Sequence, residues 1–250
     1  MTETTYARPK ASPWLVLRSL LFMLWMYGLM AVLGLFCSPL LLAPRRYTLA
    51  LVKIWARLVL GGLALLIGVK VELRGREHLP AGAALIAAKH QGMFDFIPPL
   101  TYLADPCFVL KKELMALPFF GWYAKKVGVI SIDRSGGAKT LRTMTAEAKA
   151  ALAAGRQIII FPEGTRQEPG AAPDYKPGVA GLYRELEVAC IPAATTSGVV
   201  WPAHGVARYP GVAVFEYLEP IPPGLKRGEF MRLLQERIET AGARLLGEHK

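Results

Sequence analysis

The stretch Gln157-Ile158-Ile159-Ile160-Phe161-Pro162-Glu163-Gly164-Thr165-Arg166 decides the fold. Its three consecutive isoleucines form a β-branched apolar run, which is typical of a buried parallel strand. The polar residues that follow would then emerge at the carboxyl end of that strand, where open α/β sheets place their ligands. A tight turn capped by Thr165, with a solvated Arg166, explains the same residues without a ligand. This stretch alone leaves both interpretations open.

The chain from Val69 onward alternates short apolar runs with helical periods, which predicts an α/β fold. We expect a mixed, largely parallel central sheet flanked by helices. The predicted strands are residues 70–73, 84–88, 107–110, 129–132, 157–161, 189–193 and 212–217. The predicted helices are residues 94–103, which Pro98 and Pro99 confine, and residues 138–154 and 229–247. Residues 167–176 are predicted to form an exposed loop that covers a site or merely connects two elements.

The N-terminal part is far more apolar than the rest. Residues 19–43 include no charged side chain over 25 positions, and as a helix they would extend about 37 Å, enough to cross a bilayer core of about 30 Å. Residues 58–69 form a second apolar stretch that is too short to span alone. A cleaved signal peptide is the competing interpretation, but this apolar run is longer than such peptides carry. We therefore expect a retained membrane anchor.

Basic residues gather on the same segment. Residues 1–70 hold eight Lys or Arg and one acid, Glu3, whereas the other 180 residues hold 22 basic and 18 acidic side chains. The excess would attract anionic lipid head groups, by roughly 1 kcal/mol for each basic residue close to the surface. No basic stripe with interleaved aromatics and no nucleic-acid motif occurs, so the expected partner is membrane lipid and not nucleic acid.

Basic residues flank the apolar run on both sides, so the sequence leaves open a single span and a hairpin within one leaflet. Pro39 and Pro44 would end or bend the first helix, which favours the hairpin. We expect a membrane-associated helical segment over residues 1–68 and an α/β domain over residues 69–250. The three cysteines (Cys37, Cys107 and Cys190) have no paired spacing, which predicts neither disulfides nor a metal site and favours the cytoplasm.

A second polar block, Lys89-His90-Gln91-Gly92-Met93-Phe94-Asp95, follows the strand predicted at residues 84–88. A histidine can take a proton near neutral pH, and a carboxylate can fix its tautomer. If the chain bends at Gly92, Asp95 can accept from one imidazole nitrogen of His90 while the other meets a substrate hydroxyl. The alternative is a surface histidine beside a helix-capping aspartate.

Other catalytic patterns have little support. The chain holds no Gly-x-Ser-x-Gly elbow, no Walker motif and no dinucleotide glycine motif, and Cys107 lies in no motif. Base-assisted attack by a bound alcohol remains. Arg134 directly follows the strand predicted at residues 129–132, so it would also emerge at a strand end.

Four blocks, taken in order, resemble those of the 1-acyl-sn-glycerol-3-phosphate acyltransferase (lysophosphatidic acid acyltransferase) family. They are Lys89 to Asp95, then Lys112-Glu113-Leu114 with Pro118, Phe120-Gly121 and Ile132-Asp133-Arg134, then Phe161 to Arg166, and finally Ile191-Pro192-Ala193. The resemblance covers roughly residues 70–220. The sequence departs from the family where Gly92 replaces a frequent serine, Lys89 a frequent asparagine and Ala193 a common valine.

The resemblance implies roles for these residues. His90 would be the base and Asp95 its orienting partner, while Arg134 would bind the substrate phosphate. Substrate binding is implied for Glu163, Gly164, Thr165 and Arg166, and acyl-donor binding for Ile191 and Pro192. Lys112 is a candidate donor to the oxyanion of the bound substrate.

The expected reaction moves a fatty acyl group from acyl-CoA or acyl-carrier protein to the sn-2 hydroxyl of lysophosphatidic acid, giving phosphatidic acid. We expect no cofactor and no metal. The expected location is the cell (inner) membrane, with the catalytic domain on its cytoplasmic side. The alternatives are another lysolipid acceptor such as a lyso-aminolipid, a catalytically silent membrane lipid-binding protein, and a thioesterase.

Overall fold

A computed structural model describes residues 6–133 and 137–249 of the chain. Its centre is a seven-stranded sheet in the order β1-β7-β6-β2-β5-β3-β4. The strands are β1 (Val69–Arg74), β2 (Ala84–Ala88), β3 (Pro106–Lys111), β4 (Ile130–Ile132), β5 (Gln157–Ile160), β6 (Cys190–Thr195) and β7 (Gly211–Tyr217).

The sheet is mixed and largely parallel, which confirms the predicted fold class. Strands β6, β2, β5, β3 and β4 run in one direction. Strand β7 pairs antiparallel with β6, and β1 pairs parallel with β7 at the edge. All seven predicted strands are present, with ends that differ from the prediction by at most two residues.

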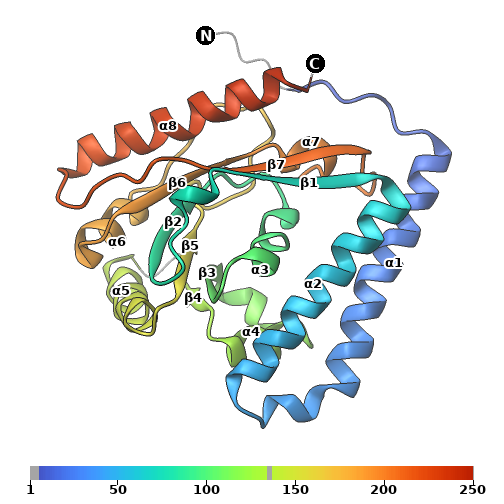
Figure 1. The fold of residues 1–250 in the computed structure, drawn as a ribbon, viewed down its shortest axis with the longest axis horizontal. Helices are drawn as coiled ribbons and strands as arrows, with labels where there is room; N and C mark the ends of the chain where they lie inside the picture. Colours follow the sequence, from blue (N-terminus) through green and yellow to red (C-terminus); the bar gives the residue numbers. More distant parts are fainter. Residues whose placement is uncertain (1–5, 134–136, 250) are drawn as a thin grey trace.

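Helices cover both faces of the sheet (Figure 1). They are α1 (Pro13–Phe36), α2 (Arg45–Ile67), α3 (Pro99–Tyr102), α4 (Phe120–Val127), α5 (Gly137–Ala153), α6 (Gly178–Leu186), α7 (Ser197–Val200) and α8 (Arg227–Gly247). Helices α5, α6 and α8 pack against one face, where Phe230, Leu234 and Ile238 of α8 join the core of β2 and β5. Helix α4 packs against the other face, where Ala124 joins a second core.

The alternation of side chains in the central strands explains the two cores. In β2, Leu85 belongs to the core beneath α5, α6 and α8, while its neighbour Ile86 belongs to the core on the α4 side. In β5, Ile158 and Ile159 divide in the same way. A strand with apolar residues on both faces is buried on both, so the isoleucine run places β5 in the interior of the sheet, beside the middle strand β2.

The N-terminal segment folds as a pair of long helices, α1 and α2, joined by a short connection that includes the 3-10 helix η1 (Ser38–Leu41). Both are long and apolar enough to cross a membrane by length and composition. The second apolar stretch, residues 58–69, was expected to be too short to span alone, but most of it belongs to the longer helix α2, which begins at Arg45 and includes Lys53 and Arg57. Pro44 is the N-cap residue of α2. A proline is tolerated at the start of a helix but not in its interior.

This helical hairpin packs on the α/β part. Phe22 and Met26 of α1 and Val59 and Leu63 of α2 are buried in one cluster with residues that include Phe94, Trp201 and Phe215. In Figure 1 the hairpin lies along one side of the molecule, with α2 between α1 and the rest of the fold. Helix α2 ends at Ile67 and β1 begins at Val69, so Gly68 alone separates them.

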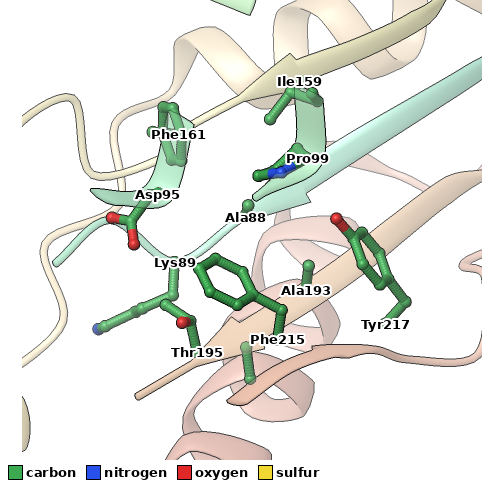
Figure 2. Close-up of a pocket in the computed structure, with 11 residues that line it drawn as sticks. Ala88, Lys89, Asp95, Pro99, Ile159, Phe161, Ala193, Thr195, Phe215 and Tyr217 are labelled. Carbon is green, nitrogen blue, oxygen red and sulfur yellow. The ribbon is translucent and has the colours of Figure 1, made fainter. Parts of the chain in front are cut away.

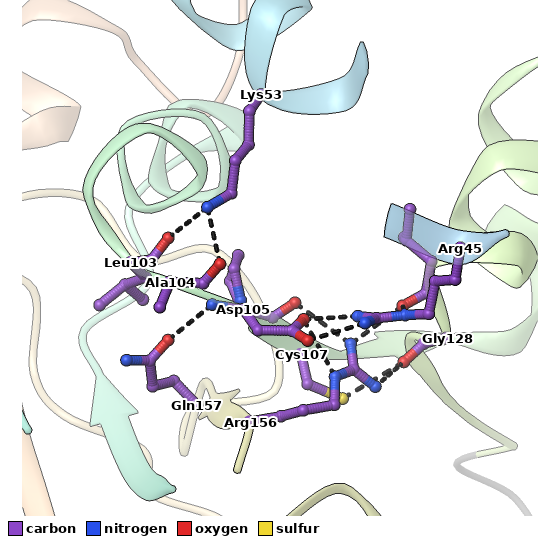
Figure 3. A network of polar contacts seen from close by, with 11 residues as sticks. Arg45, Lys53, Leu103, Ala104, Asp105, Cys107, Gly128, Arg156 and Gln157 are labelled. Atoms are coloured by element: carbon purple, nitrogen blue, oxygen red, sulfur yellow. Dashed lines mark hydrogen bonds and ion pairs between the residues drawn. The ribbon is translucent and has the colours of Figure 1, made fainter. Parts of the chain in front are cut away.

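A polar network fastens the start of α2 to the sheet (Figure 3). The guanidinium of Arg45 donates two hydrogen bonds to the carboxylate of Asp105, at 2.7 and 2.5 Å. Arg156, which is buried, donates to the same carboxylate at 3.1 Å and to the carbonyl oxygen of Gly128 at 2.7 Å. Lys53 donates to the carbonyl oxygens of residues 103 and 104. Arg45 and Lys53 of α2 therefore face the α/β part of the fold, here called the sheet domain.

The predicted helix over residues 94–103 is wrong in its continuity. The structure has the 3-10 helix η3 (Met93–Phe96), then Ile97 and Pro98, then the short helix α3 (Pro99–Tyr102). A proline lacks the backbone N–H that a continuous helix needs, and it restricts the residue before it. Pro98 and Pro99 therefore divide the segment in two.

Candidate active site

The carboxyl ends of the parallel strands bring four segments to one edge of the sheet. His90 follows β2, Glu163 follows β5, Ser197 follows β6, and Lys111 is the last residue of β3. Strand β2 pairs with β5 on one side and with β6 on the other, so the segments after these three strands are neighbours. Parallel α/β sheets place ligands at this edge.

His90 and Asp95 form a buried pair at the end of β2. The Nδ1 atom of His90 lies 2.9 Å from Oδ2 of Asp95. The same oxygen accepts hydrogen bonds from the backbone N–H groups of Gln91 at 2.7 Å and Gly92 at 2.9 Å. The other oxygen, Oδ1, accepts from the hydroxyl of Ser197. Four donors therefore fix the carboxylate, which fixes the imidazole.

Close packing makes the turn between the two residues tight. A Cβ atom added at Gly92 would lie 3.0 Å from the carbonyl oxygen of Trp201, so a side chain here would need that neighbour to shift. The turn leads into η3, which places Asp95 one turn after the bend and opposite the histidine. The bend predicted at Gly92 is confirmed.

Aromatic side chains hold the imidazole ring. His90 stacks on Phe161, with ring centroids 4.3 Å apart, and meets the edge of Phe96 at 5.5 Å. The main chain of His90 is held as well, because its N–H donates to Oε2 of Glu163 at 3.0 Å and its carbonyl oxygen accepts from the N–H of Gln167 at 2.8 Å. Among the described residues, no hydrogen-bond partner is found for Nε2 of His90.

A cavity of about 1080 Å³ opens beside this ring, and His90 forms part of its wall. One part of the lining is apolar and comes mainly from β3, α5 and α6, including Leu110, Met144 and Val179. The described residues of the wall also include five cationic ones, which are Lys111, Arg166, Lys176, Arg184 and Arg227. A volume of this size suits a ligand with both an apolar and an anionic portion.

Glu163 is the one acidic residue among the described residues of the cavity wall, and its carboxylate is directed into the protein interior, toward Lys89. The side chain is fully buried, and Oε1 forms an ion pair of 2.6 Å with the ammonium of Lys89. Burial raises the pKa of Glu163, while the Lys89 charge and the N–H of His90 oppose that rise. The charged residues among the described residues of the cavity wall are therefore mainly cationic.

The structure brings together most of the substrate-binding residues predicted from the sequence. Gly164, Thr165 and Arg166 all line the cavity beside His90. Arg166 is exposed and donates to the carbonyl oxygen of Ala203 at 3.3 Å, which leaves other guanidinium N–H groups for a ligand. Gly164 has a φ of 66°, a left-handed conformation that favours glycine at this turn.

Three other predicted residues lie elsewhere. Lys112 begins the 3-10 helix η4 (Lys112–Ala116) and is not part of the cavity wall, whereas its neighbour Lys111 is. Ile191 and Pro192 lie within β6, buried in the sheet, and neither lines the cavity. Arg134 lies outside the described residues.

The loop predicted at residues 167–176 is tied to the site at several points. Besides the bond from Gln167 to His90, the N–H of Lys176 donates to the carbonyl oxygen of Pro162 at 2.8 Å. Glu168 accepts a hydrogen bond of 2.6 Å from Arg8, whose guanidinium also donates to the carbonyl oxygen of Gly198 at 2.7 Å. The loop therefore contributes to the shape of the site and is not an idle connection.

Two residues of the site were not found by sequence reasoning. Ser197 is separated from Asp95 by about a hundred positions, and no local pattern marks it as a partner. Lys111 ends a strand, and that position is the signal that could have distinguished it from Lys112.

A second, very small cavity of about 10 Å³ lies between Asp95, Phe215 and Tyr217. Figure 2 shows the Lys89 side chain extending away from the rings of Phe215 and Tyr217.

Comparisons with known proteins agree with this geometry. The family model described as Acyltransferase matches residues 70–196. The 1-acyl-sn-glycerol-3-phosphate acyltransferase of Pseudomonas aeruginosa is 32% identical over 185 residues, which are 72% of this chain and 69% of that protein. The lyso-ornithine lipid O-acyltransferase of the same organism is 31% identical over 193 residues, which are 68% of this chain and 72% of that protein.

A solved structure has a similar fold. The crystal structure of the 1-acyl-sn-glycerophosphate (LPA) acyltransferase from Thermotoga maritima superposes with a TM-score of 0.77 at 22% sequence identity. The match covers 92% of this chain and 97% of that chain, so the likeness includes the helical hairpin as well as the sheet.

Proposed function

We propose that this chain, which belongs to the acyltransferase family, moves a fatty acyl group from a thioester donor to the sn-2 hydroxyl of 1-acyl-glycerol-3-phosphate. The observation that carries the proposal is that His90, paired with Asp95, forms part of the wall of a cavity lined by both cationic and apolar side chains. A lysophosphatidate has the matching anionic and apolar portions.

The pair is arranged for general base catalysis. Because Nδ1 of His90 faces Asp95, Nε2 is the nitrogen that takes the proton from the acceptor hydroxyl. The hydroxyl oxygen attacks the thioester carbonyl, the carbon–sulfur bond breaks, and the leaving thiolate takes from His90 the proton that came from the hydroxyl. Thiols have a pKa of about 8.5, so the thiolate leaves far more easily than an alkoxide. Asp95 stabilises the imidazolium between the two transfers.

The cations of the cavity support the choice of an anionic acceptor. Arg166 lies in the segment that follows β5 and Lys111 ends β3, so both come from the same sheet edge as His90. A guanidinium can bind a phosphate through two parallel N–H groups. Holding the phosphate would place the hydroxyl near the base, and such positioning is a large part of the rate of a two-substrate reaction. The donor is a substrate, and this scheme uses no cofactor.

We also propose that the hairpin embeds in one leaflet of the membrane. Its outer face exposes large apolar side chains, among them Leu24 at 71%, Phe36 at 76% and Leu65 at 83%. The opposite face of α2 is occupied by the sheet domain, which Arg45 and Lys53 contact. A helix that is packed against a polar domain along one side cannot have lipid all round it, so lying in one leaflet suits this hairpin better than crossing the bilayer.

Charge on the outer face tests the membrane proposal. Leu24→Glu together with Leu65→Glu should leave the fold intact and release the protein from vesicles in a flotation assay, because both side chains are exposed. Glu236→Gln on the distant helix α8 is the control. Undiminished flotation of the double variant would contradict embedding.

The proposed setting is the inner face of the cell membrane, where lysophosphatidate and the donor meet.

The reaction is tested by purified protein in lipid vesicles with a panel of lysolipid acceptors and with acyl-CoA or acyl-carrier donors. Formation of phosphatidic acid that His90→Ala abolishes is the expected result. Free fatty acid without an acylated acceptor would identify a thioesterase instead.

A second acceptor is favoured by one specific comparison. The similar protein from Pseudomonas aeruginosa is named for lyso-ornithine lipid, so an amino-containing lysolipid is the second candidate acceptor. The cationic cavity wall argues for the phosphate monoester, because an ammonium group on the acceptor would be repelled there. Faster transfer to the lyso-aminolipid than to lysophosphatidate in the same panel would reverse this choice.

A further inference from the structure

Lys89 occupies a buried position directly before the proposed base. It is 6% exposed, and its backbone N–H donates to the carbonyl oxygen of Ala193 in β6 at 2.8 Å. Its ammonium lies between two carboxylates, 2.6 Å from Oε1 of Glu163 and 2.7 Å from Oε1 of Glu239. It does not line the large cavity, so it is not placed to touch a substrate there.

Glu163 transmits the position of this ammonium to the base. One of its oxygens faces Lys89 while the other accepts the backbone N–H of His90. The carboxylate has no exposed surface, so water cannot replace the lysine as its partner without a rearrangement. Burial raises the pKa of Glu163, and the charge of Lys89 is the first of the opposing influences. A change in the ammonium would therefore alter both the charge and the orientation of the group that holds His90.

Glu239 belongs to α8, which lies beyond the residues that the family model matches. Its Oε1 accepts from Lys89 and also from the hydroxyl of Tyr175, at 2.9 Å. One carboxylate would suffice to balance one ammonium. The second gives the cluster a net negative charge, and it joins α8 and the loop of residues 167–176 to the end of β2.

We propose that Lys89 and Glu239 are positioning residues for His90: Glu239 holds the Lys89 ammonium against Glu163, and Glu163 fixes the main chain of the base. The position of the catalytic histidine is then set partly from the C-terminal helix. This inference rests on the proposed acyl transfer for its kinetic test. The rate of chemical modification of His90 tests it without that reaction.

The kinetic test compares Lys89→Met, Glu239→Gln and the double variant. We expect kcat to fall about fivefold for Glu239→Gln and about fiftyfold for Lys89→Met, with the KM of both substrates changed less than twofold, because neither residue contacts substrate. The double variant should be no slower than Lys89→Met, because both changes act through the contact between Lys89 and Glu163. Glu236→Gln, an exposed glutamate on the same helix that pairs with Arg232, is the matched control and should keep the full rate.

The second measurement is the rate at which diethyl pyrocarbonate modifies each histidine of the full-length protein, located by peptide mass spectrometry. The His90 side chain is 10% exposed. We expect its modification to be several-fold faster in Lys89→Met and modestly faster in Glu239→Gln, relative to His78 in the same sample. If the unaltered protein acylates no lysolipid, the proposed function fails, yet these rates still test the positioning.

Three outcomes would overturn the inference. A raised KM with unchanged kcat would make Lys89 a substrate ligand. Losses of kcat that multiply in the double variant would show that the two residues act independently. An unchanged modification rate of His90 in variants with a lower kcat would show that the lysine acts somewhere other than on the base.

Discussion

Nδ1 of His90 lies 2.9 Å from Oδ2 of Asp95, and that contact assigns different tasks to the two ring nitrogens. Nδ1 is the donor to the carboxylate, so Nε2 is the nitrogen that is free to take a proton. The carboxylate is itself fixed by the N–H groups of Gln91 and Gly92 and by the hydroxyl of Ser197. The geometry that we propose for proton transfer therefore rests on contacts within the protein.

Removing the base should remove most of the activity. His90→Ala is expected to lower kcat by about 10²- to 10⁴-fold, the usual contribution of a general base, with little change in the KM of the acceptor. Steady-state rates with lysophosphatidate and an acyl thioester measure this, and thermal unfolding confirms that the variant is folded. A variant that keeps a tenth or more of the rate would show that another group accepts the proton.

Ser197 should matter through Asp95 alone. Ser197→Ala leaves Oδ1 of the buried carboxylate without its hydroxyl donor, so we expect kcat to fall roughly tenfold and stability to fall by about 1–3 kcal/mol. Thr101→Ala is a suitable control, because it also removes a hydroxyl donor but from the carbonyl oxygen of Pro98. Equal kcat values for the two variants would contradict the role of Ser197.

Arg166 should distinguish between acceptors. Arg166→Ala is expected to raise the KM for a lysophosphatidate by tenfold or more, because a charge-assisted contact to phosphate contributes roughly 1.5–3 kcal/mol. The KM for a zwitterionic lysolipid should change much less. Arg232→Ala, an exposed arginine on α8, controls for loss of charge. An equal effect on both acceptors would mean that Arg166 does not bind the phosphate.

The network at Asp105 should stabilise the fold in a pH-dependent way. Burial pushes the pKa of Asp105 up, but the hydrogen bonds and charges of Arg45 and Arg156 bring it below its usual value. The carboxylate therefore stabilises the fold fully above about pH 4, and this contribution is lost as pH falls through the lowered value.

Asp105→Asn should therefore lower the midpoint of thermal unfolding at pH 7, by an amount that corresponds to roughly 2 kcal/mol. The difference from the unaltered protein should shrink as the pH falls below 4. Glu236→Gln, which removes an exposed pair, should have almost no effect. A difference that stays constant down to pH 2 would show that the ion pairs contribute nothing.

Close packing of the hairpin can be tested with two glycines of α1. A Cβ atom added at Gly34 would lie 2.7 Å from a ring carbon of Phe119 and 3.0 Å from its Cβ, whereas nothing lies within 4 Å of one added at Gly28. Alanine is the better helix former by up to about 1 kcal/mol. Gly28→Ala should therefore raise the unfolding midpoint, while Gly34→Ala should lower it by overpacking. Equal shifts in the same detergent would contradict the packing of α1 on Phe119.

The sequence predicted the sheet well because its central strands are apolar on both faces. The isoleucines of β5 and the alanine-rich β2 leave little doubt about type or position, since buried parallel strands form such continuous runs. The order of the strands could not be read in this way. No local pattern shows that β1 pairs with β7, because that pairing joins positions more than a hundred residues apart.

Helix α2 was underestimated for a physical reason. Lys53 and Arg57 interrupt its apolar residues, and hydropathy alone treats a charge as the end of a membrane helix. The structure shows that Lys53 reaches the carbonyl oxygens at the end of the segment that contains α3. A partner that lies fifty residues away cannot be seen in a hydropathy profile.

The site divides along the same line between local and distant information. His90, Asp95 and the residues around Arg166 were predictable because each block lies within a few positions after a strand. Ser197 and Glu239 join the site only through the fold, and Lys111 differs from Lys112 only by which of the two ends the strand.

The one-residue junction at Gly68 fixes the hairpin relative to the sheet domain, whereas a flexible linker would not. A flexible linker would let the sheet domain move at varying heights above the membrane. Here α2 runs into β1 through one residue, and Arg45 holds Asp105 at the start of β3, the strand whose other end carries Lys111 into the cavity. If the hairpin embeds in one leaflet as proposed, its depth in the lipid sets the height of the cavity, and a lipid acceptor reaches the cavity by lateral diffusion at that one level.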